Sequence, residues 1–498
     1  MKVLVANRGE IAVRILRACR ELGLASVAVY SEADREALHT RYADEAVHIG
    51  PAAARESYLS IPAILEAARG SGAEAVHPGY GFLSENAAFA QAVEDAGMVF
   101  IGPNPKTLAL TGDKLAARKF ARDVGLPVLP GPDRPLRAGQ AGADPTLAQG
   151  IDGLLFPLLV KAVAGGGGRG IRLVKEQGEL ASMVAAARKE AQMAFGDDGV
   201  YLEPLVPHAR HIEVQILGDG EGRVMCLGDR ECSVQRRRQK LIEEAPAPGL
   251  SAVQRAYVAE AAVRLGGALA YRSLGTVEFL LGSDGVFHFI EINPRIQVEH
   301  PVTEMVSGVD LVREQLRLAA GCALAYREDA VALRGAAIEA RVLAEKPEES
   351  FLPTTGEITY LKEPGGPGIR VDSALYQGMT VTTDYDSLLA KVIAWGETRV
   401  AALLRLRRAL GEFQIGGVTT DLGFLVQVLH SVPFICGDID TTFLDRFEPR
   451  QPDTGAQLER IVAVAVAMLA HRKRSLARSV NDHAQAGDWR ATAWREQM

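Results

Sequence analysis

The first hundred residues alternate between short apolar segments and longer segments with helical periodicity, and this rhythm constrains the fold more than any other feature. An apolar segment at 3–7 precedes a helical pattern over 10–23, and a second apolar segment follows at 26–30. A strand, a crossover helix and a second strand form a parallel pair, so the pattern predicts a Rossmann-like α/β domain with a parallel sheet over residues 1–112. The turn after the first segment reads NRGE instead of G-x-G-x-x-G, which argues against a nicotinamide site.

The remainder of the chain is expected to form α+β units. A Pro/Gly-rich stretch at 126–145 marks a hinge or a boundary. A compact α+β lobe should follow from about 155 to 203, and a strand-rich segment from 211 to 301. Residues 335–445 have the pattern of another α+β unit, and beyond about 450 the composition changes to an Ala/Arg-rich helical segment with a polar tail.

Charge and cysteine content restrict the class of protein. The 498 residues carry a net charge of −7, which argues against bulk nucleic-acid binding but leaves room for a local anion site. Five scattered cysteines without metal-ligand spacing fit a reducing cytoplasm. No apolar run approaches the roughly 20 residues of a membrane span, and no secretory signal precedes the first strand. We therefore expect a soluble cytoplasmic protein.

The run FIEINPRIQVEHPVTE at 289–304 concentrates groups that can handle a metal, an anion or a proton. If the run is extended, successive side chains point to opposite faces and its polar side chains share one face. These side chains are Glu291, Asn293, Arg295, Gln297 and Glu299. Two carboxylates, two amides and a guanidinium on one face of a core strand need a use, so a site is favoured over a solvated strand edge.

The residues before this run predict a β-hairpin that brings two carboxylates together. The segment 275–293 reads as two strands with Gly-Ser-Asp-Gly at the tip. With a two-residue turn at the centre of that tip, Glu278 lies opposite Phe289 and diagonal to Glu291, with Cα atoms roughly 7–8 Å apart. Two carboxylates at that separation can hold Mg²⁺ beside nucleotide phosphates, and Asn293 extends the set.

A glycine-rich loop between two apolar segments predicts an anion site. The segment 156–174 reads as a strand, a loop and a strand, with Lys161 at the end of the first strand and Arg169 in the loop. Backbone N–H groups in such a loop can approach a phosphate closely. The glycines are Gly165, Gly166, Gly167 and Gly168. A flexible linker is the alternative, but two apolar strands and a lysine seldom frame a linker.

Two further segments give weaker signals. HIEVQILG places His211, Glu213 and Gln215 on one face of a strand, which fits a site or a solvent-facing edge equally well. The segment 229–248 contains three consecutive arginines and Lys240. Such a run is usually a solvated face. Here acids flank it and phosphate-site motifs surround it, so we favour binding of a small anion.

Ten strings of the sequence match one known family in the family's order. They are ANRGEIAVRILRACRELG, HPGYGFLSEN, GDK, KAVAGGGGRG, RHIEVQILGD, ECSVQRR, EEAPAP, GTVEFL, EINPRIQVEHPVTEMVSGVDLVREQL and DSLLAKVI. Over roughly residues 1–445 the chain thus resembles a biotin carboxylase of the ATP-grasp superfamily, a component of biotin-dependent acyl-CoA and pyruvate carboxylases. The resemblance implies an ATP-grasp domain over 113–315 with a mobile lid lobe at about 131–204, and a C-terminal α+β domain over 335–445.

The resemblance also assigns nucleotide and metal roles. The implied nucleotide-binding positions are Lys114, Lys161, Gly165, Gly166, Gly167, Gly168, Glu203, His211, Gln235, Arg238, Glu278 and Glu291. The implied ligands of Mg²⁺ or Mn²⁺ are Glu278, Glu291 and Asn293. Relatives commonly have histidine or asparagine where this chain has Arg238, so the arginine would add a charge beside the nucleotide.

The acid–base chemistry is implied for the run at 289–304 and its neighbours. The implied catalytic residues are Glu299, Arg295, Lys240 and Arg341. Bicarbonate would be held by Lys240, Arg295, Gln297 and Val298, and biotin would lie near Tyr80, Gly81 and Arg341. In this assignment Glu299 deprotonates bicarbonate and Arg341 stabilises the biotin enolate.

The implied reaction is the ATP-dependent carboxylation of biotin with bicarbonate through carboxyphosphate, which gives carboxybiotin, ADP and phosphate. It is the first half-reaction of a biotin-dependent carboxylase, and a carboxylate beside cationic anchors suits it. A biotin attachment motif, a lysine between methionines, is absent. We therefore expect biotin on a separate carrier protein, partnership with a carboxyltransferase subunit, a homodimer, and a partner-docking role for residues 450–498.

Two other functions are considered. The first is another ATP-grasp ligase that joins a carboxylate to an amine through an acyl-phosphate, although the RIQVEHPVTE run and Arg341 favour bicarbonate. The second is a non-catalytic subunit that senses nucleotide. Its only support is Arg238 and Pro204, a proline at a position where relatives commonly have a lysine. An assay of ADP release with candidate acids and with biotin distinguishes them.

Overall fold

The computed structural model describes residues 1–136, 154–164, 171–326 and 331–449, together with Met468. Within residues Met1–Phe447, the described part of the chain forms one compact unit. Apart from Met468, the predicted C-terminal extension lies outside the described residues. The four glycines of the predicted anion loop and part of the predicted lid lobe also lie outside them.

The N-terminal part contains a five-stranded sheet in the order β3-β2-β1-β4-β5, and all its strand pairs are parallel. Its strands are β1 (Lys2–Val5), β2 (Ala25–Tyr30), β3 (Glu45–His48), β4 (Ala75–His77) and β5 (Val99–Phe100). Its helices are α1 (Gly9–Glu21), α2 (Leu38–Tyr42), α3 (Ile61–Ser71), α4 (Ala87–Asp95) and α5 (Pro105–Gly112). The predicted parallel α/β sheet is therefore confirmed.

Local sequence explains where these helices begin. The side chains of Ser60, Asn86 and Asn104 accept a backbone N–H from the first turn of α3, α4 and α5, respectively. Such caps satisfy N–H groups that have no partner inside the helix. Helix α1 buries Ile11 and Ile15 against the sheet, which fixes the loop between β1 and α1 near the carboxyl ends of the strands.

A smaller lobe follows. Helix α6 (Lys114–Asp123) leads to a three-stranded antiparallel sheet in the order β7-β6-β8, which α8 covers. The elements are β6 (Leu158–Ala162), β7 (Arg172–Val174), α8 (Leu180–Phe195) and β8 (Val200–Pro204).

An antiparallel sheet of eight strands forms the centre, in the order β13-β12-β9-β10-β11-β14-β21-β19. The strands are β9 (Arg210–Asp219), β10 (Val224–Arg236), β11 (Gln239–Ala245), β12 (Arg272–Leu281), β13 (Phe287–Asn293), β14 (Ala336–Leu343), β19 (Ile369–Ser373) and β21 (Leu388–Gly396). The sheet runs without a break from the predicted ATP-grasp segment into the predicted C-terminal domain, through the pairing of β11 with β14.

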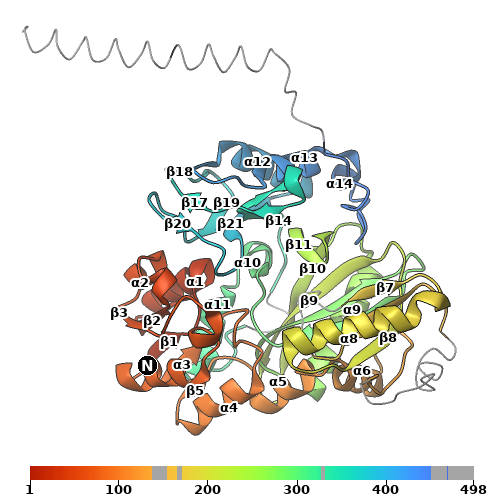
Figure 1. The fold of residues 1–498 in the computed structure, drawn as a ribbon, viewed down its shortest axis with the longest axis horizontal. Helices are drawn as coiled ribbons and strands as arrows, with labels where there is room; N and C mark the ends of the chain where they lie inside the picture. The colour runs from red at the N-terminus through yellow and green to blue at the C-terminus, as the bar shows by residue number, and fades with distance from the viewer. Residues whose placement is uncertain (137–153, 165–170, 327–330, 450–467, 469–498) are drawn as a thin grey trace, which may run out of the picture. The chain divides into compact units, whose positions relative to one another are not determined.

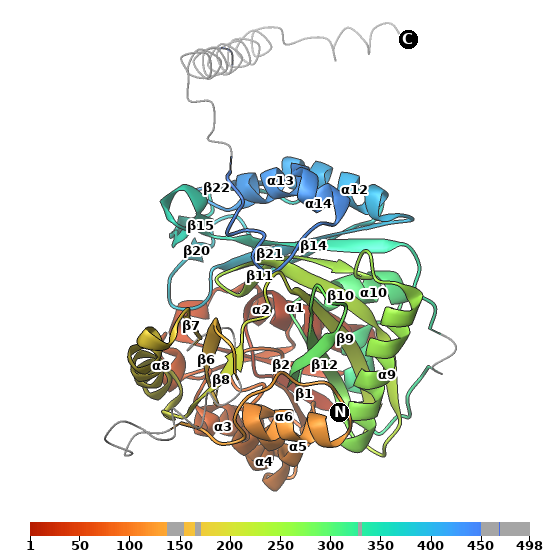
Figure 2. The same ribbon diagram turned by 90° about the vertical axis from the view of Figure 1, so that its right-hand side faces the viewer.

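Helices cover both faces of this sheet (Figures 1 and 2). They are α9 (Ala252–Ala268), α10 (His300–Ser307), α11 (Leu311–Ala319), α12 (Arg399–Glu412), α13 (Leu422–His430) and α14 (Val432–Cys436). Short strand pairs flank it: β15 (Glu345–Lys346) with β16 (Leu352–Pro353), β17 (Gly356–Glu357) with β20 (Thr380–Val381), and β18 (Tyr360–Lys362) with β22 (Gln414–Gly416). Helix α12 packs on one face of β14 and β21, and α10 packs on the other.

The β12–β13 hairpin is present, but its register differs from the prediction. Glu278 pairs directly with Glu291, and Phe279 with Phe289, so one extra residue on β13 forms a bulge between them. The turn is also longer than two residues, because Gly285 at φ 81° takes a left-handed conformation that accommodates a wider turn. The two carboxylates are therefore direct neighbours and not diagonal ones.

The run at 289–304 is extended only to Asn293, so the prediction of one extended face up to Glu299 is wrong. Pro294 has no N–H for the ladder and ends the strand, an irregular turn follows, and α10 begins at His300. The polar side chains of the run converge all the same, because the turn folds back toward β11 and β12.

Candidate active site

Two carboxylates face each other at the β12–β13 hairpin. Glu278 is buried, and its Oε1 accepts an N–H from Asn293 at 2.7 Å. Glu291 accepts a bond from the ammonium of Lys114 at 2.6 Å. Burial alone would raise the pKa of Glu278, but the charges of Lys240 and His211 hold it below its ordinary value. Glu278 is thus stabilised as a carboxylate.

The residues present fit a hard divalent cation. Two carboxylates directly opposite each other and the amide of Asn293 supply oxygen donors of the type that Mg²⁺ and Mn²⁺ take. A second group, formed by His211, Glu213 and Glu278, brings its ligand atoms within 4.8 Å of one another. Glu278 belongs to both groups, so it could serve as a metal ligand in either one.

Lys240, near the start of β11, joins three carboxylates. Its Nζ donates to Glu213 at 2.6 Å, to Glu278 at 3.1 Å and to Glu299 at 2.6 Å. Burial would raise the pKa of Glu299, but Lys240, Arg341 and Arg230 together hold it well below its ordinary value. Glu299 is therefore ionised at neutral pH although its side chain is buried.

Arg230 contacts the cluster of Lys240 and its three carboxylates through Glu213. It is fully buried on β10, donates to the carboxylate of Glu213, and donates from Nη1 to Gln215 at 2.8 Å and to Thr303 at 2.9 Å. The polar face predicted for HIEVQILG is therefore buried and not solvent-facing. Arg230 was not predicted from the sequence, although a charged residue in an otherwise apolar strand is itself a signal.

The turn after β13 carries the next group of predicted residues. Arg295 donates to Glu85 at 2.5 Å and to the side-chain oxygen of Gln297 at 2.8 Å. Gln297 in turn donates to Glu278 at 3.2 Å. The backbone oxygen of Val298 accepts a bond from Lys391 at 2.8 Å. Neither Glu85 nor Lys391 was singled out in the sequence.

Arg341 contacts the Glu299 carboxylate at Oε2, the oxygen that does not accept from Lys240. Its Nη2 donates to Glu299 at 2.9 Å, and its Nε donates to Glu243 at 2.6 Å. Glu299 therefore lies between the cations of Lys240 and Arg341. Glu243, which also escaped the sequence analysis, is fully buried on β11.

The predicted biotin positions lie at the junction with the N-terminal part. Tyr80 donates its hydroxyl proton to Glu10, and Glu10 forms an ion pair with Lys391 at 3.0 Å. Gly81 has φ 67°, which a side chain would strain. The same Lys391 contacts Val298, so the structure connects Tyr80 to the turn that presents Glu299.

The predicted nucleotide positions gather on the other side of Glu278. Lys161 on β6 forms a buried ion pair with Glu203 on β8. His211 lies 3.0 Å from Glu278, and its other ring nitrogen lies 3.3 Å from the amide of Gln235. Together with Lys114 on α6, the side chains of Lys161, Glu203, His211 and Gln235 come from five different elements.

Arg238 lies at the tip between β10 and β11, at φ 65°. Its Nη1 donates at 3.1 Å to the backbone oxygen of Ile171, the first described residue after the glycine loop. Arg238 therefore contacts the lobe that carries the predicted phosphate-binding loop.

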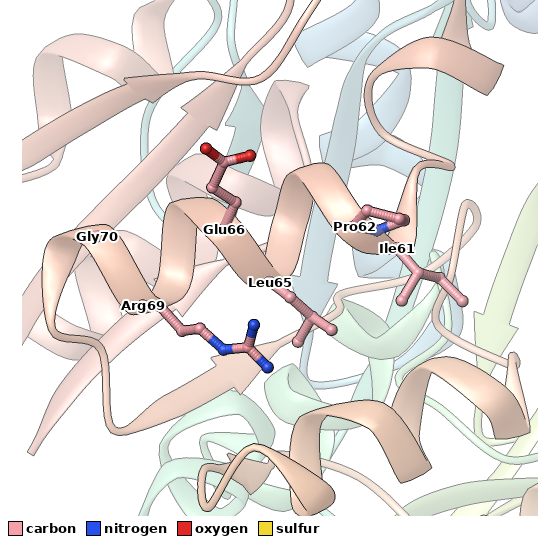
Figure 3. Close-up of a pocket in the computed structure, with 6 residues that line it drawn as sticks. All are labelled: Ile61, Pro62, Leu65, Glu66, Arg69 and Gly70. Atoms are coloured by element: carbon pink, nitrogen blue, oxygen red, sulfur yellow. The ribbon is translucent and has the colours of Figure 1, made fainter.

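A hollow elsewhere on the molecule carries none of this chemistry. A cavity of about 710 Å³ lies on the outer face of α3 and is lined by Ile61, Pro62, Leu65, Glu66, Arg69 and Gly70 (Figure 3). One carboxylate and one guanidinium on a single helix do not converge on a point, so this hollow is no candidate for the active site.

No helix among the described residues has both the length and the apolar character needed to cross a bilayer.

Known protein families cover nearly the whole described chain. Residues 1–108 match the family model "Biotin carboxylase, N-terminal domain", and residues 113–327 match "Carbamoyl-phosphate synthase L chain, ATP binding domain". Residues 339–446 match "Biotin carboxylase C-terminal domain". The chain is 49% identical over 443 residues to a biotin carboxylase of Nostoc sp., an alignment that covers 89% of this chain and 98% of that protein.

Solved structures agree. The chain is 42% identical to a biotin carboxylase from Campylobacter jejuni solved as a β,γ-ATP complex, with a TM-score of 0.86 and coverage of 90% of this chain and 98% of that one. It is 43% identical to the biotin carboxylase domain of the Hydrogenobacter thermophilus 2-oxoglutarate carboxylase, with a TM-score of 0.87 and coverage of 90% and 99%. That structure is a dimer in complex with MgADP, ADP and bicarbonate.

Proposed function

The chain belongs to the biotin carboxylase family and catalyses the ATP-dependent carboxylation of biotin, and from this premise we propose which residues perform each part of the reaction. One observation carries the proposal. The buried carboxylate of Glu299 is held ionised between Lys240 and Arg341, next to the Glu278–Glu291 pair. A base, two cations and a metal-type donor set thus adjoin one another.

The nucleotide is proposed to bind on the side of Glu278 that faces β6 and β8. Lys114 and Lys161 would meet its phosphates beneath the glycines at 165–168, and Glu203, His211 and Gln235 would line the base and the ribose. Arg238 would add positive charge beside the nucleotide, next to the lobe that carries these glycines. Glu278, Glu291 and Asn293 would hold Mg²⁺ or Mn²⁺. When bound, this metal spreads the negative charge of the phosphates during transfer.

Bicarbonate is proposed to bind between Lys240 and Arg295, with Gln297 and the backbone of Val298 completing the site. Its negative charge would compete for the cations that now hold Glu299 ionised. A like charge beside a carboxylate raises its pKa. Binding of the substrate would therefore convert Glu299 from a weak base into one able to take the proton of bicarbonate.

The deprotonated bicarbonate oxygen attacks the γ-phosphorus of ATP, which forms carboxyphosphate and expels ADP. Carboxyphosphate breaks its C–O bond to give CO₂ and trianionic phosphate. This phosphate takes the ureido N–H proton of biotin, and the resulting nitrogen nucleophile adds to CO₂. Arg341 would stabilise the negative charge that develops on the ureido oxygen, near Tyr80 and Gly81.

Partner proteins follow from the chemistry and from the names of relatives. One relative, 48% identical over 447 residues, is a pyruvate carboxylase subunit of Methanothermobacter thermautotrophicus. By analogy, biotin would arrive on a separate carrier protein in the cytoplasm, a carboxyltransferase would consume carboxybiotin, and the chain would form a homodimer. Residues 450–498 would dock a partner, so deleting them should weaken assembly and leave turnover of free biotin unchanged.

The direct test is transfer of labelled carbon from bicarbonate to free biotin. With ATP and Mg²⁺ the protein should form acid-labile carboxybiotin in an amount that matches ADP release. Glu299→Gln should abolish it, whereas the control Glu260→Gln, on the exposed side of α9, should not. ADP release that depends on another carboxylic acid and not on biotin would favour a different ATP-grasp ligase.

A further inference from the structure

Two acids that the proposed reaction does not use lie behind Arg341. Glu243 on β11 pairs directly with Glu339 on β14, so both side chains emerge on the same face of the sheet. Directly opposite side chains have Cβ atoms about 4.5–5.5 Å apart. Both residues are fully buried. Two carboxyl groups therefore share one small space without solvent.

Their hydrogen bonds are incomplete. Arg341 occupies only Oε1 of Glu243. Within the part of the chain that the structure describes, Oε2 of Glu243 and both carboxyl oxygens of Glu339 have no hydrogen-bond partner. An ionised carboxylate without partners in the interior is very costly, and a proton between the two groups would remove one charge and supply one hydrogen bond.

Among the described residues, each cation near the pair already has other carboxylate partners. The charged and titratable groups around the pair are Cys232 on β10, Lys240 on β11, Arg341 on β14, Lys391 on β21, Glu299 in the turn before α10, and His300 and Glu304 on α10. Lys240 is shared among three carboxylates and Arg341 between Glu243 and Glu299.

Among the described residues the remaining groups give the pair no hydrogen bond either, although the charge of Lys391 opposes the rise of the Glu339 pKa. Lys391 already pairs with Glu10 and lies 3.9 Å from Asp372. Glu304 accepts from Arg370 at 2.6 Å, and burial holds the pKa of His300 well below its ordinary value, which leaves the imidazole neutral. The rest of this face is apolar: Val302, Val306, Ala337 and Ile393 form one buried cluster.

We propose that Glu243 and Glu339 share one proton and, as a carboxylic acid–carboxylate pair, position the guanidinium of Arg341 between Glu243 and Glu299. Both acids act through Arg341, so they are positioning residues, and the proposal rests on the role given above to Arg341. Burial raises the pKa of both groups, that of Glu339 well above its ordinary value. Such a pair titrates as a unit.

The shared proton sets how much of the charge of Arg341 remains for the substrate. With the proton present, the pair carries one negative charge. Loss of the proton adds a second negative charge beside Arg341, which draws the guanidinium toward the pair and weakens its stabilisation of the ureido oxygen. Turnover of biotin should therefore fall at alkaline pH for a reason that lies outside the substrate site.

Two measurements on the full chain test the pair, each with Glu339→Gln. Gln has nearly the same shape, carries no charge and can donate an N–H to Glu243. In infrared spectra at neutral pH, the parent should show carbonyl absorption from protonated buried carboxylic acids, and one component of it should be missing in Glu339→Gln and present in Asp421→Asn. In kinetics, the alkaline decline of kcat/KM for free biotin should become at least about threefold shallower in Glu339→Gln, with kcat near neutral pH retained.

Asp421→Asn is the matched control. Asp421 is a fully buried acid whose pKa burial also raises. It lies at the start of α13, and its side chain accepts the backbone N–H of Leu343 at 2.8 Å instead of a bond from Arg341. Its variant should leave the kinetic pH profile unchanged. A parent spectrum with no band sensitive to Glu339, or an alkaline decline identical in Glu339→Gln and parent, overturns the proposal. The infrared result is independent of turnover, so a parent without biotin-dependent activity would refute the proposed function separately.

Discussion

The ammonium group of Lys240 lies within hydrogen-bonding distance of three buried carboxylates, those of Glu213, Glu278 and Glu299. Burial would lower the pKa of this lysine, but the three carboxylates raise it well above its ordinary value. Lys240 is therefore always charged, and at the scale of single residues it is what allows Glu299 to remain ionised in the interior.

Replacing Lys240 by Met should destabilise the fold as well as abolish activity. It leaves three buried carboxylates short of one cation, and breaking a buried ion pair from one side costs about 3–5 kcal/mol. Urea unfolding and biotin-dependent ADP release measure the two effects. Lys119→Met, at an exposed position on α6, is the control and should change neither. Unchanged stability in Lys240→Met would contradict this role.

The pH dependence of stability tests Glu243. Burial raises its pKa from 4.5 to about 7 although Arg341 opposes the shift. The folded state therefore binds more protons than the unfolded state between these two values, so the contribution of Glu243 to the free energy of unfolding falls as pH rises through this window. Urea titrations at about pH 5 and about pH 8 should show a smaller decline for Glu243→Gln than for the parent. Equal declines would show that Glu243 has an ordinary pKa.

At the scale of elements, the β12–β13 hairpin determines the metal-type donor set. The sequence predicted the hairpin and both carboxylates, because alternation and the Gly-Ser-Asp-Gly tip are local signals. It could not predict the bulge before Glu291 or the five-residue turn, since both depend on how β13 packs against its neighbours. The spacing of residues in the sequence does not reveal a strand register that tertiary packing determines.

The hairpin makes a prediction about metal dependence. Glu291→Gln removes one of the two facing carboxylates and keeps the shape, so the concentration of Mg²⁺ that gives half-maximal ADP release should rise about tenfold or more. Titrating Mg²⁺ at saturating ATP measures this shift, and removing the metal with a chelator should stop turnover of the parent. Glu260→Gln should titrate like the parent. An unchanged metal requirement in Glu291→Gln would place the metal elsewhere.

The turn after β13 shows a second limit of sequence analysis. Arg295, Gln297 and Glu299 were grouped by assuming one extended strand, which is wrong beyond Asn293. They lie close together nevertheless, because the turn returns to the sheet. There Glu299 accepts a hydrogen bond from Lys240, and Gln297 donates one to Glu278. Residue chemistry was thus the better guide, and geometry inferred from alternation was the weaker one.

At the scale of the whole unit 1–447, the site forms where three parts of the chain meet. Glu10 comes from the N-terminal part, Val298 from the central part and Lys391 from β21 in the C-terminal part. The parallel sheet and the α+β units could be predicted from periodicity. The junction could not, because Lys391 lies in an apolar strand and its partners are distant in sequence. Only its presence as a lone charge in LLAKVIAW gave a hint.

Lys391→Met should loosen this junction. It leaves Glu10 and the backbone oxygen of Val298 without their buried cation, so the free energy of unfolding should fall by about 3–5 kcal/mol. The turn that presents Glu299 would lose an anchor, so the KM for bicarbonate should rise. Thermal unfolding and bicarbonate titration measure the effects, with the exposed Lys362→Met as control. If Lys391→Met had the free energy of unfolding and the KM for bicarbonate of the parent, Lys391 would not anchor this junction.

In the proposed reaction, Glu299 deprotonates bicarbonate and so makes it the nucleophile toward ATP. Turnover with ¹⁸O-labelled bicarbonate, biotin, Mg²⁺ and ATP tests it most directly, because attack through a bicarbonate oxygen leaves that oxygen on the released phosphate. The parent should release phosphate with one labelled oxygen, and Glu299→Gln should form neither labelled phosphate nor carboxybiotin. Phosphate that carries only oxygen from ATP and water during biotin-dependent turnover would contradict it.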